Sequence, residues 1–245
     1  EERHSMIIKA VNERASVTIA ELAEMLDVSA STVKRDLIIL ANEGKIIKVR
    51  GGAMSRNESF TSVEKNVEEK ASICTEEKMT IAKYAAELIE NGDFVFLDAG
   101  TTTEKMIDYL NVKDVTFVTN GFIHAKKLAR KGYKVFITGG EIKASTEAIV
   151  GAECVLTLKN YNFTKCFMGT NGISLTAGFT TPDVNEARVK SAAIESSREV
   201  YVLADHSKFD EVSSATFAGL GKAVIITDRI PNRKYNNAAD ITEVG

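Results

Sequence analysis

Apolar residues recur with a helical period at the start of the chain. The pattern covers residues 3–13 and again residues 19–26, with a short extended step at 16–18 between them. Spacings of three and four residues place these side chains on one face of each segment, which predicts two amphipathic helices that share a core. The predicted core positions are Met6, Ile7, Ala10 and Val11 in the first helix and Leu22, Ala23 and Leu26 in the second.

A third helix is predicted between Ser29 and Gly44. Asp27-Val28 breaks the second helix, Ser29 suits an N-cap, and Gly44 is a natural C-terminal stop. At about 100° per residue this helix has two distinct faces. The apolar face, which must pack on the first two helices, carries Val33, Leu37, Leu40 and Ala41. The opposite face shows Ser31 and Arg35, flanked by Thr32, with Lys34 at the margin. Hydroxyls and an arginine near the start of a helix that follows a tight turn are typical of a recognition helix for DNA.

The next segment, residues 45–53, predicts a small wing. Basic and apolar residues alternate up to Gly51-Gly52, so that Lys48 and Arg50 lie on one side of a hairpin and can contact DNA phosphates. The third helix alone would fit a solvated face of a helical bundle equally well, and the wing favours DNA binding. The predicted DNA contacts are Arg35 to guanine edges, Ser29, Ser31 and Thr32 to bases or phosphates, and Lys34, Lys48 and Arg50 to phosphates.

The pattern changes at residue 76 to alternating helices and short apolar strands. After a helix over 76–91, strands are predicted at 94–97, 116–119, 135–137, 166–168, 200–203 and 224–226. Apolar strands separated by helices predict a Rossmann-like α/β domain, with a largely parallel sheet covered on both faces. We therefore expect three parts: a winged helix-turn-helix over 1–56, a polar linker over 57–75 that is a hinge or is partly helical, and an α/β domain over 76–245.

Small polar residues follow the predicted strands, and in such sheets ligands bind beyond the carboxyl ends of the strands. The residues expected to form this site are Asp98, Gly100, Thr101, Thr102, Thr103, Asn120, Gly139, Gly140, Glu141, Asn171, Asp183, Glu186 and Lys208. The three threonines and Lys208 suit a phosphate, whereas the carboxylates and amides suit sugar hydroxyls. No Walker or dinucleotide motif occurs, so we expect no nucleotide or other cofactor.

Charge and composition narrow the class of protein. The net charge is −3, yet residues 29–56 carry six basic residues against two acidic ones, as expected for a DNA-facing surface on an acidic chain. No apolar stretch is long enough for a membrane helix. The three cysteines are scattered without CxxC pairing, which favours reduced thiols in the cytoplasm. The three histidines share no metal-ligand spacing, so no metal site is expected.

The sequence from Val17 to Ala53, VTIAELAEMLDVSASTVKRDLIILANEGKIIKVRGGA, resembles the helix-turn-helix of the DeoR family of bacterial sugar-catabolism repressors. The motifs DAGTTT, VTN, TGGE and LADHSKF resemble the effector domain of the same family, so the resemblance covers nearly the whole chain. It implies a repressor of sugar utilisation that binds operator DNA and responds to a phosphorylated sugar. Family members often carry two arginines where this chain has Lys34-Arg35, and for that reason Lys34 is assigned to phosphate.

The effector domain also resembles ribose-5-phosphate isomerase, which leaves an enzyme as the alternative. Glu186 stands where the catalytic base would be, but Met168 and Asn171 replace two carboxylates, and Ala177 stands about where a lysine is expected. Without those partners proton transfer would lose orders of magnitude in rate, so we expect binding without turnover and no catalytic residue. Two-fold operators require at least a homodimer or a higher homo-oligomer.

Overall fold

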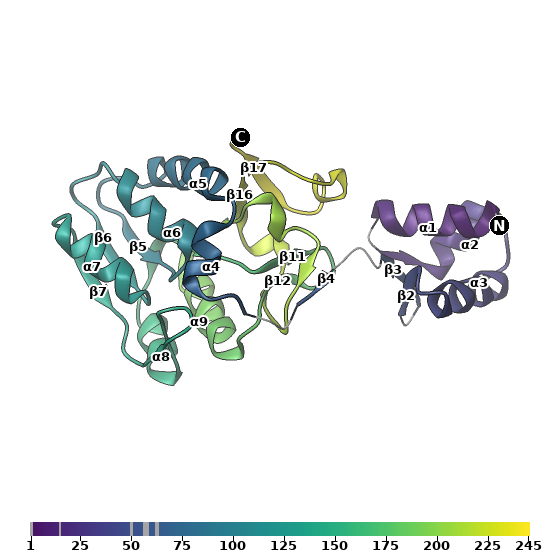
Figure 1. The fold of residues 1–245 in the computed structure, drawn as a ribbon, viewed down its shortest axis with the longest axis horizontal. Coiled ribbons are helices and arrows are strands. Elements are labelled where there is room, and N and C mark those ends of the chain that lie inside the picture. The colour runs from purple at the N-terminus through teal and green to yellow at the C-terminus, as the bar shows by residue number, and fades with distance from the viewer. Residues whose placement is uncertain (1, 15, 50, 56–58, 62–63) are drawn as a thin grey trace. The chain divides into compact units, whose positions relative to one another are not determined.

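The computed structural model describes residues 2–14, 16–49, 51–55, 59–61 and 64–245. The chain divides into two compact units, Glu1–Ser59 and Phe60–Gly245, which are described separately (Figure 1). Within the described ranges, no helix is both long enough and apolar enough to cross a membrane.

The smaller unit is a winged helix-turn-helix, as predicted. Its elements are α1 (Glu2–Arg14), β1 (Ser16–Thr18), α2 (Ile19–Leu26), α3 (Ala30–Asn42), β2 (Ile46–Val49) and β3 (Gly52–Ser55). The three strands form an antiparallel sheet in the order β1-β3-β2. Its core centres on Ile7, Val11, Leu22, Val33, Leu37 and Leu40, all fully buried. Met6 is the exception to the predicted stripe: it is 46% exposed, because position 6 falls on the outer edge of α1.

Local capping explains where α2 and α3 begin and end. Thr18 caps α2 in a reciprocal capping box with Glu21, and Asp27 ends that helix in the left-handed conformation at φ 51°. Ser29 caps α3 by accepting a hydrogen bond from the Thr32 N–H at 3.2 Å. Gly44, at φ 71°, closes α3 by donating its N–H to the Ala41 carbonyl at 3.0 Å. The predicted limits of the third helix are therefore confirmed.

The larger unit contains a seven-stranded, all-parallel sheet in the order β17-β16-β13-β10-β5-β6-β7. The strands are β5 (Phe94–Leu97), β6 (Thr116–Thr119), β7 (Lys134–Ile137), β10 (Phe163–Gly169), β13 (Ser197–Leu203), β16 (Val224–Thr227) and β17 (Asp240–Glu243). The first six confirm the predicted strands and the Rossmann-like class. The strand β17 was not predicted, since a polar edge strand lacks the apolar signal.

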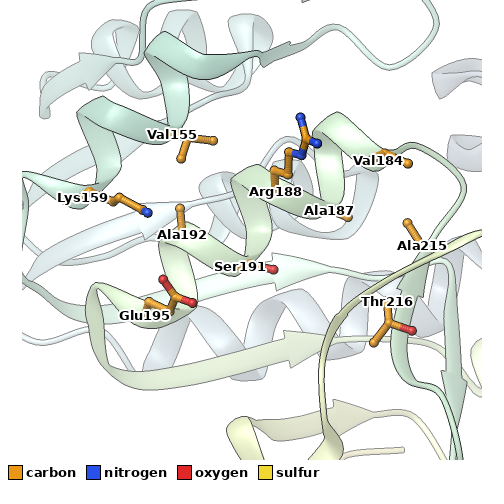
Figure 2. Close-up of a pocket in the computed structure, with 10 residues that line it drawn as sticks. All are labelled: Val155, Lys159, Val184, Ala187, Arg188, Ser191, Ala192, Glu195, Ala215 and Thr216. Atoms are coloured by element: carbon orange, nitrogen blue, oxygen red, sulfur yellow. The ribbon is translucent and has the colours of Figure 1, made fainter.

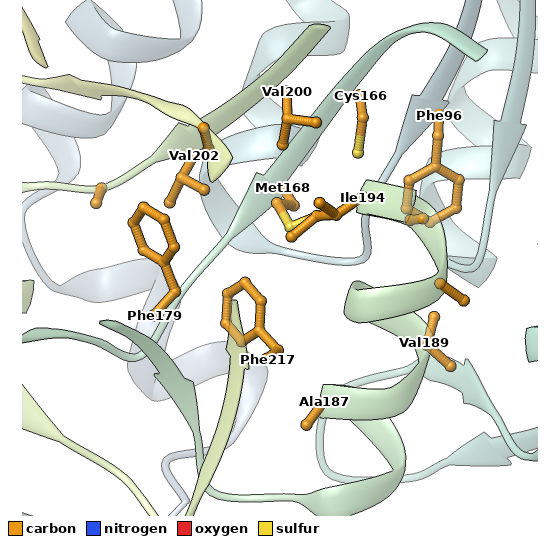
Figure 3. Packing of buried hydrophobic residues seen from close by; sticks show 14 of the residues in the cluster. Phe96, Cys166, Met168, Phe179, Ala187, Val189, Ile194, Val200, Val202 and Phe217 are labelled. Atoms are coloured by element: carbon orange, nitrogen blue, oxygen red, sulfur yellow. The ribbon is translucent and has the colours of Figure 1, made fainter. Parts of the chain in front are cut away.

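Helices cover both faces of this sheet (Figure 1). They are α5 (Thr75–Glu87), α6 (Thr101–Met106), α7 (Phe122–Arg130), α8 (Ala152–Lys159) and α9 (Val184–Glu195), with 3-10 turns at Ile107–Tyr109, His206–Lys208, Leu220–Lys222 and Arg233–Tyr235. Alternate strand residues face two different cores: Phe96 packs with α8 and α9, whereas Val95 and Leu97 pack with α5 and α6. Figure 3 shows the first core, where Phe96 and Met168 of the sheet lie beside Ile194 of α9.

Short antiparallel strands surround the main sheet. They are β8 (Glu141–Lys143) with β9 (Ala148–Val150), β12 (Gly178–Thr181) between β11 (Gly172–Ser174) and β15 (Ala215–Ala218), and β14 (Glu211–Val212) with β4 (Ser59–Phe60). Part of the expected linker over 57–75 is packed on the larger unit. The helix α4 (Val67–Ser72) lies there, and the Val67 N–H donates to the Ser145 carbonyl at 3.1 Å. Because α4 contacts the larger unit through polar groups, its sequence shows no periodic pattern of apolar residues. The sequence therefore did not predict that this segment packs on the larger unit.

Candidate functional site

The predicted DNA-contacting residues of the smaller unit lie mostly on the outer face of α3. Ser31, Lys34 and Arg35 are exposed, opposite the buried positions of the same helix. Lys48 is exposed on β2, and Arg50 lies outside the described residues. The Ser29 hydroxyl is also 2.8 Å from the Ser31 hydroxyl and 2.9 Å from that of Thr32. These three residues therefore form one hydroxyl cluster at the start of α3, in which Ser29 is primarily a helix cap.

A buried carboxylate orients α3 on α1. Asp36 of α3 accepts hydrogen bonds from Arg3 at 2.6 and 3.1 Å and lies 3.1 Å from His4 Nε2. The bonds from Arg3 hold the pKa of Asp36 below its ordinary value, and the bond from His4 adds to this effect. Sequence reasoning assigned Asp36 no role. Its partners are more than 30 positions away, so the pair is visible only in the fold.

The predicted ligand-binding end of the larger unit lies where the strand order reverses. Chain order runs outward from β5 to β6 and β7 on one side and from β10 to β13, β16 and β17 on the other. The gap between the carboxyl ends of β5 and β10 is thus the topological switch point at which open α/β sheets bind ligands. Asp98 follows β5, and Gly169 ends β10.

A buried ion pair occupies this switch point. Lys190 of α9 contacts Asp98 Oδ2 and donates to the Gly169 carbonyl at 3.0 Å, while the Gly169 N–H donates to Asp98 Oδ2 at 3.1 Å. Both side chains are almost fully buried. Asp98, expected to bind a sugar hydroxyl, therefore holds the two strand ends together. The sequence analysis did not include Lys190 in the site. Its i+4 spacing from Glu186 places both side chains on one face of the helix and could have indicated it.

The loop after β5 is fixed by Thr103, His124 and Asn120. The Thr103 hydroxyl donates toward the Asp98 carbonyl at 2.6 Å and lies 3.1 Å from His124 Nε2. Asn120 accepts from the Ala99 N–H at 2.9 Å. Burial lowers the pKa of His124, so this side chain is neutral at physiological pH. Thr103 and Asn120, both expected to contact a ligand, thus support the loop that carries Gly100 and Thr101.

Two lysines lie beside Asp205 in the turn after β13. Lys208 Nζ lies 3.9 Å from Asp205 Oδ2, an oxygen that is buried without a hydrogen-bond partner among the described residues. Lys78 is buried, and desolvation lowers its pKa to about 8, with Asp205 opposing and Lys208 adding to the shift. Thr101 is half-buried and Thr102 is buried. Of the two lysines beside Asp205, Lys208 was predicted and Lys78 was not.

A second polar cluster surrounds Glu186 of α9. Its carboxylate accepts from Thr146 at 2.7 Å, from Lys143 at 3.3 Å and from Thr181 at 3.3 Å. Asp183 caps α9 through the Asn185 and Glu186 N–H groups and pairs with Lys143 at 3.1 Å. Asn171 accepts from the Thr181 hydroxyl at 3.1 Å. The structure thus brings together three predicted residues, Asn171, Asp183 and Glu186, and adds Lys143, which sequence reasoning missed.

Three other predicted residues lie at the end of β7 and the start of β8. Gly139 and Gly140 are exposed in the turn between β7 and β8, and Glu141 is exposed at the first position of β8. Gly140 has φ 132°, and a Cβ there would lie 2.3 Å from the Val150 carbonyl oxygen. Backbone geometry explains this glycine without a ligand.

The carboxylates near His206 do not require a metal ion. His206 lies with Cys74 and Asp205, and also with Glu77 and Asp228, with candidate ligand atoms within 4.8 Å of one another. However, His206 Nδ1 is already 2.7 Å from Asp228 Oδ2, and Lys78 and Lys208 already supply positive charge beside Asp205. We assign the cluster to structural ion pairing.

A separate groove lies away from these residues (Figure 2). It has a volume of about 380 Å³, and its lining comes from α8, α9 and β15, including Val155, Arg188 and Thr216. None of the predicted site residues lines it. Helical geometry places Glu186 and Lys190 on the face of α9 opposite the residues that line the groove.

Comparisons with known proteins match both units. The DeoR-like helix-turn-helix domain matches residues 3–59, and the DeoR C terminal sensor domain matches residues 73–229. The uncharacterized HTH-type transcriptional regulator FruR of Bacillus subtilis (strain 168) is 42% identical over 244 residues, which is 99% of this chain and 96% of that protein. The lactose phosphotransferase system repressor of Staphylococcus aureus (strain NCTC 8325 / PS 47) is 36% identical over 247 residues, covering 99% and 98%.

The matches among solved structures are more distant than these relatives. Ribose 5-phosphate isomerase A of Methanocaldococcus jannaschii has a TM-score of 0.39 at 17% identity, covering 54% of this chain and 53% of that one. The full-length sorbitol operon regulator SorC of Klebsiella pneumoniae has a TM-score of 0.37 at 12% identity, covering 84% and 90%.

Proposed function

The chain belongs to the DeoR family of transcriptional regulators, and from this premise we propose that it represses a sugar-utilisation operon and leaves its operator when a phosphorylated sugar binds. The observation that carries the proposal is the convergence of polar side chains at the switch point between β5 and β10, in a chain whose other unit is a winged helix-turn-helix. Such a protein acts in the cytoplasm, where its operator and its effector meet.

The effector lies between the two polar clusters of the larger unit. Its phosphate is held by Thr101 and Lys208, with Lys78 behind them. Its hydroxyls contact the cluster around Glu186 and Asn171. A polyol phosphate fits this division, because one end is an anion that needs cationic partners and the other end exchanges hydrogen bonds with carboxylates and amides.

Operator binding uses α3 and the wing of two copies. The exposed hydroxyl cluster and Arg35 read bases in the major groove, while Lys34, Lys48 and Arg50 contact phosphates. Recognition helices about 34 Å apart, as half-sites one helical turn apart require, call for a homodimer. The larger unit, with its extensive core, is the part able to bury a stable interface between copies.

Thermal unfolding against matched ligands tests the effector. The panel contains ribose 5-phosphate, fructose 1-phosphate, fructose 6-phosphate and glucose 6-phosphate, each paired with its free sugar. At 100 times its dissociation constant, a ligand stabilises the protein by about 2.7 kcal/mol. We expect one phosphosugar to raise the melting temperature and its free sugar to leave it unchanged. If no compound shifts the transition, the effector half of the proposal fails while the DNA-binding half stands.

The same samples test the alternative of an isomerase. Lys143 stands 3.3 Å from Glu186, so a lysine does lie near the candidate base, although it comes from β8 and is shared among three carboxylates. The Glu186 carboxylate already accepts hydrogen bonds from Lys143, Thr146 and Thr181, so its oxygens are engaged with protein groups. We expect NMR spectra of ribose 5-phosphate to show no ribulose 5-phosphate after incubation with the protein. Enzyme-like conversion would establish the alternative.

A further inference from the structure

The helix α4 is held to the larger unit by polar contacts and not by a core. None of its six residues is buried. Asn66 and Glu69 form a capping box at its start, which stabilises the helix itself but does not attach it. Elements with few buried apolar contacts open at low free energy. The contacts at the two ends of α4 therefore decide whether it stays docked.

The N-terminal end is tied to the cluster around Glu186. Glu64 Oε2 lies 2.5 Å from Lys143 Nζ and 3.4 Å from the Ser145 hydroxyl. The same ammonium lies 3.1 Å from Asp183 and 3.3 Å from Glu186. One cation with three N–H donors thus serves three carboxylates, and one of them, Glu64, belongs to the segment that precedes α4.

The C-terminal end is tied to the proposed phosphate end. Lys78 Nζ donates to the Lys70 carbonyl, and the charges of Asp205 and Lys208 act on the same ammonium. The Lys70 side chain extends back toward the other cluster, where its Nζ lies 3.7 Å from Glu64 Oε1. Burial lowers the pKa of Lys70, and the charges of Glu186 and Glu64 oppose that shift. The helix therefore bridges the two polar clusters between which the effector is proposed to bind.

We propose that α4 couples effector binding to the DNA-binding unit, with Lys143 as the coupling residue. An oxygen of the effector accepts a hydrogen bond from the Lys143 ammonium in place of Glu64. The N-terminal end of α4 is then released from the larger unit. This inference rests on the proposed function. In the sequence, Glu64 follows β4 (Ser59–Phe60), which pairs with β14 of the larger unit, and the smaller unit ends at Ser59. The connecting segment is thus held to the larger unit at two places, by the pairing of β4 with β14 and by the contact of Glu64 with Lys143, and release of Glu64 removes the second of these.

The variant Glu64→Gln separates coupling from simple ligand contact. It removes the carboxylate that competes with the effector for Lys143. The effector should therefore bind the variant at least about threefold more tightly than the wild type, which corresponds to about 0.7 kcal/mol. The ratio of operator affinities without and with effector, expected at about 5–150 in the wild type, should fall toward 1. The effector is the panel compound that stabilises the wild type, and its affinity is measured by calorimetry on the full chain.

A matched control is Asp93→Asn. Asp93 pairs with Lys165 at 2.8 Å, with both groups largely buried, at the amino ends of β5 and β10 and away from α4. This variant loses one carboxylate of a comparable pair and should keep the wild-type coupling ratio. Tyrosine fluorescence melts verify that both variants fold.

Hydrogen exchange gives a second readout that needs no variant. With effector bound, backbone amides of residues 64–72 should exchange faster, whereas those of β5 and α6 should exchange more slowly. Slower or unchanged exchange in 64–72 overturns the inference. So does a Glu64→Gln protein with wild-type effector affinity and coupling, or one that loses effector binding altogether. If the wild type binds no panel compound, the proposed function fails first and the inference with it.

Discussion

Lys190→Met is expected to lower the free energy of unfolding of the larger unit by about 3–5 kcal/mol, because it leaves the Asp98 carboxylate buried and without its cation. The side chains of Lys190 and Asp98 are only 7% and 3% exposed, so water cannot replace the lost partner. Methionine keeps most of the volume of the lysine stem, which limits the effect to charge and hydrogen bonding. The loss should also loosen the junction of β5 and β10 and weaken effector binding.

Tyrosine fluorescence during urea unfolding measures this effect. The chain has no tryptophan, and all six tyrosines lie at or after residue 84, so the signal reports on the larger unit alone. The double variant Asp98→Asn with Lys190→Met removes the stranded charge and should recover part of the stability, as a double-mutant cycle measures. If Lys190→Met lowered the free energy of unfolding by less than about 1 kcal/mol, the Lys190–Asp98 pair would not be what holds the ends of β5 and β10 together.

Arg35→Ala is expected to weaken specific operator binding by about 1–3 kcal/mol and to relax the base preference at one position of each half-site. Arg35 is exposed on the outer face of α3, so its removal should leave the folded state intact. The planar guanidinium can donate two parallel hydrogen bonds to one guanine, which alanine cannot replace. Fluorescence anisotropy at fixed salt, with specific and scrambled duplexes, measures both affinity and specificity.

The control for charge is Arg130→Ala. Arg130 is exposed at the end of α7 in the larger unit, and its removal changes the net charge by the same amount. We expect it to leave operator affinity within about 0.5 kcal/mol of the wild type. If Arg35→Ala binds the operator normally while Arg130→Ala does not, the assignment of α3 as the recognition helix is wrong.

Periodicity was sufficient to predict most of the architecture. The stripe of Val33, Leu37 and Leu40 placed α3 on its neighbours with the correct face inward, since helical geometry converts spacing directly into direction. Apolar runs predicted six strands of the main sheet for the same reason. The short strands β11, β12 and β15 escaped because glycine and threonine carry little apolar signal.

The sequence predicted which loops form the candidate site, but it did not predict which side chains contact one another within it. Residues after strand ends converge because parallel strands share one edge, so the region around Asp98, Asn171 and Glu186 was expected. Which side chains pair within it depends on elements far apart in the sequence: Asp98 and Lys190 are separated by 92 positions. Thr103 and Asn120 have the chemistry of ligand contacts, yet the backbone of their own loop uses their hydrogen-bonding groups.

Release of operator DNA by a phosphosugar is the measurement that joins the proposed roles of the two units. A duplex selected by the protein from a random pool is labelled, and its anisotropy is followed as the stabilising phosphosugar is added, with the free sugar as control. We expect the phosphosugar to lower operator affinity by about 5-fold to 150-fold and operator DNA to weaken phosphosugar binding by the same factor. Operator affinity that is unchanged by a phosphosugar bound at saturation would contradict it.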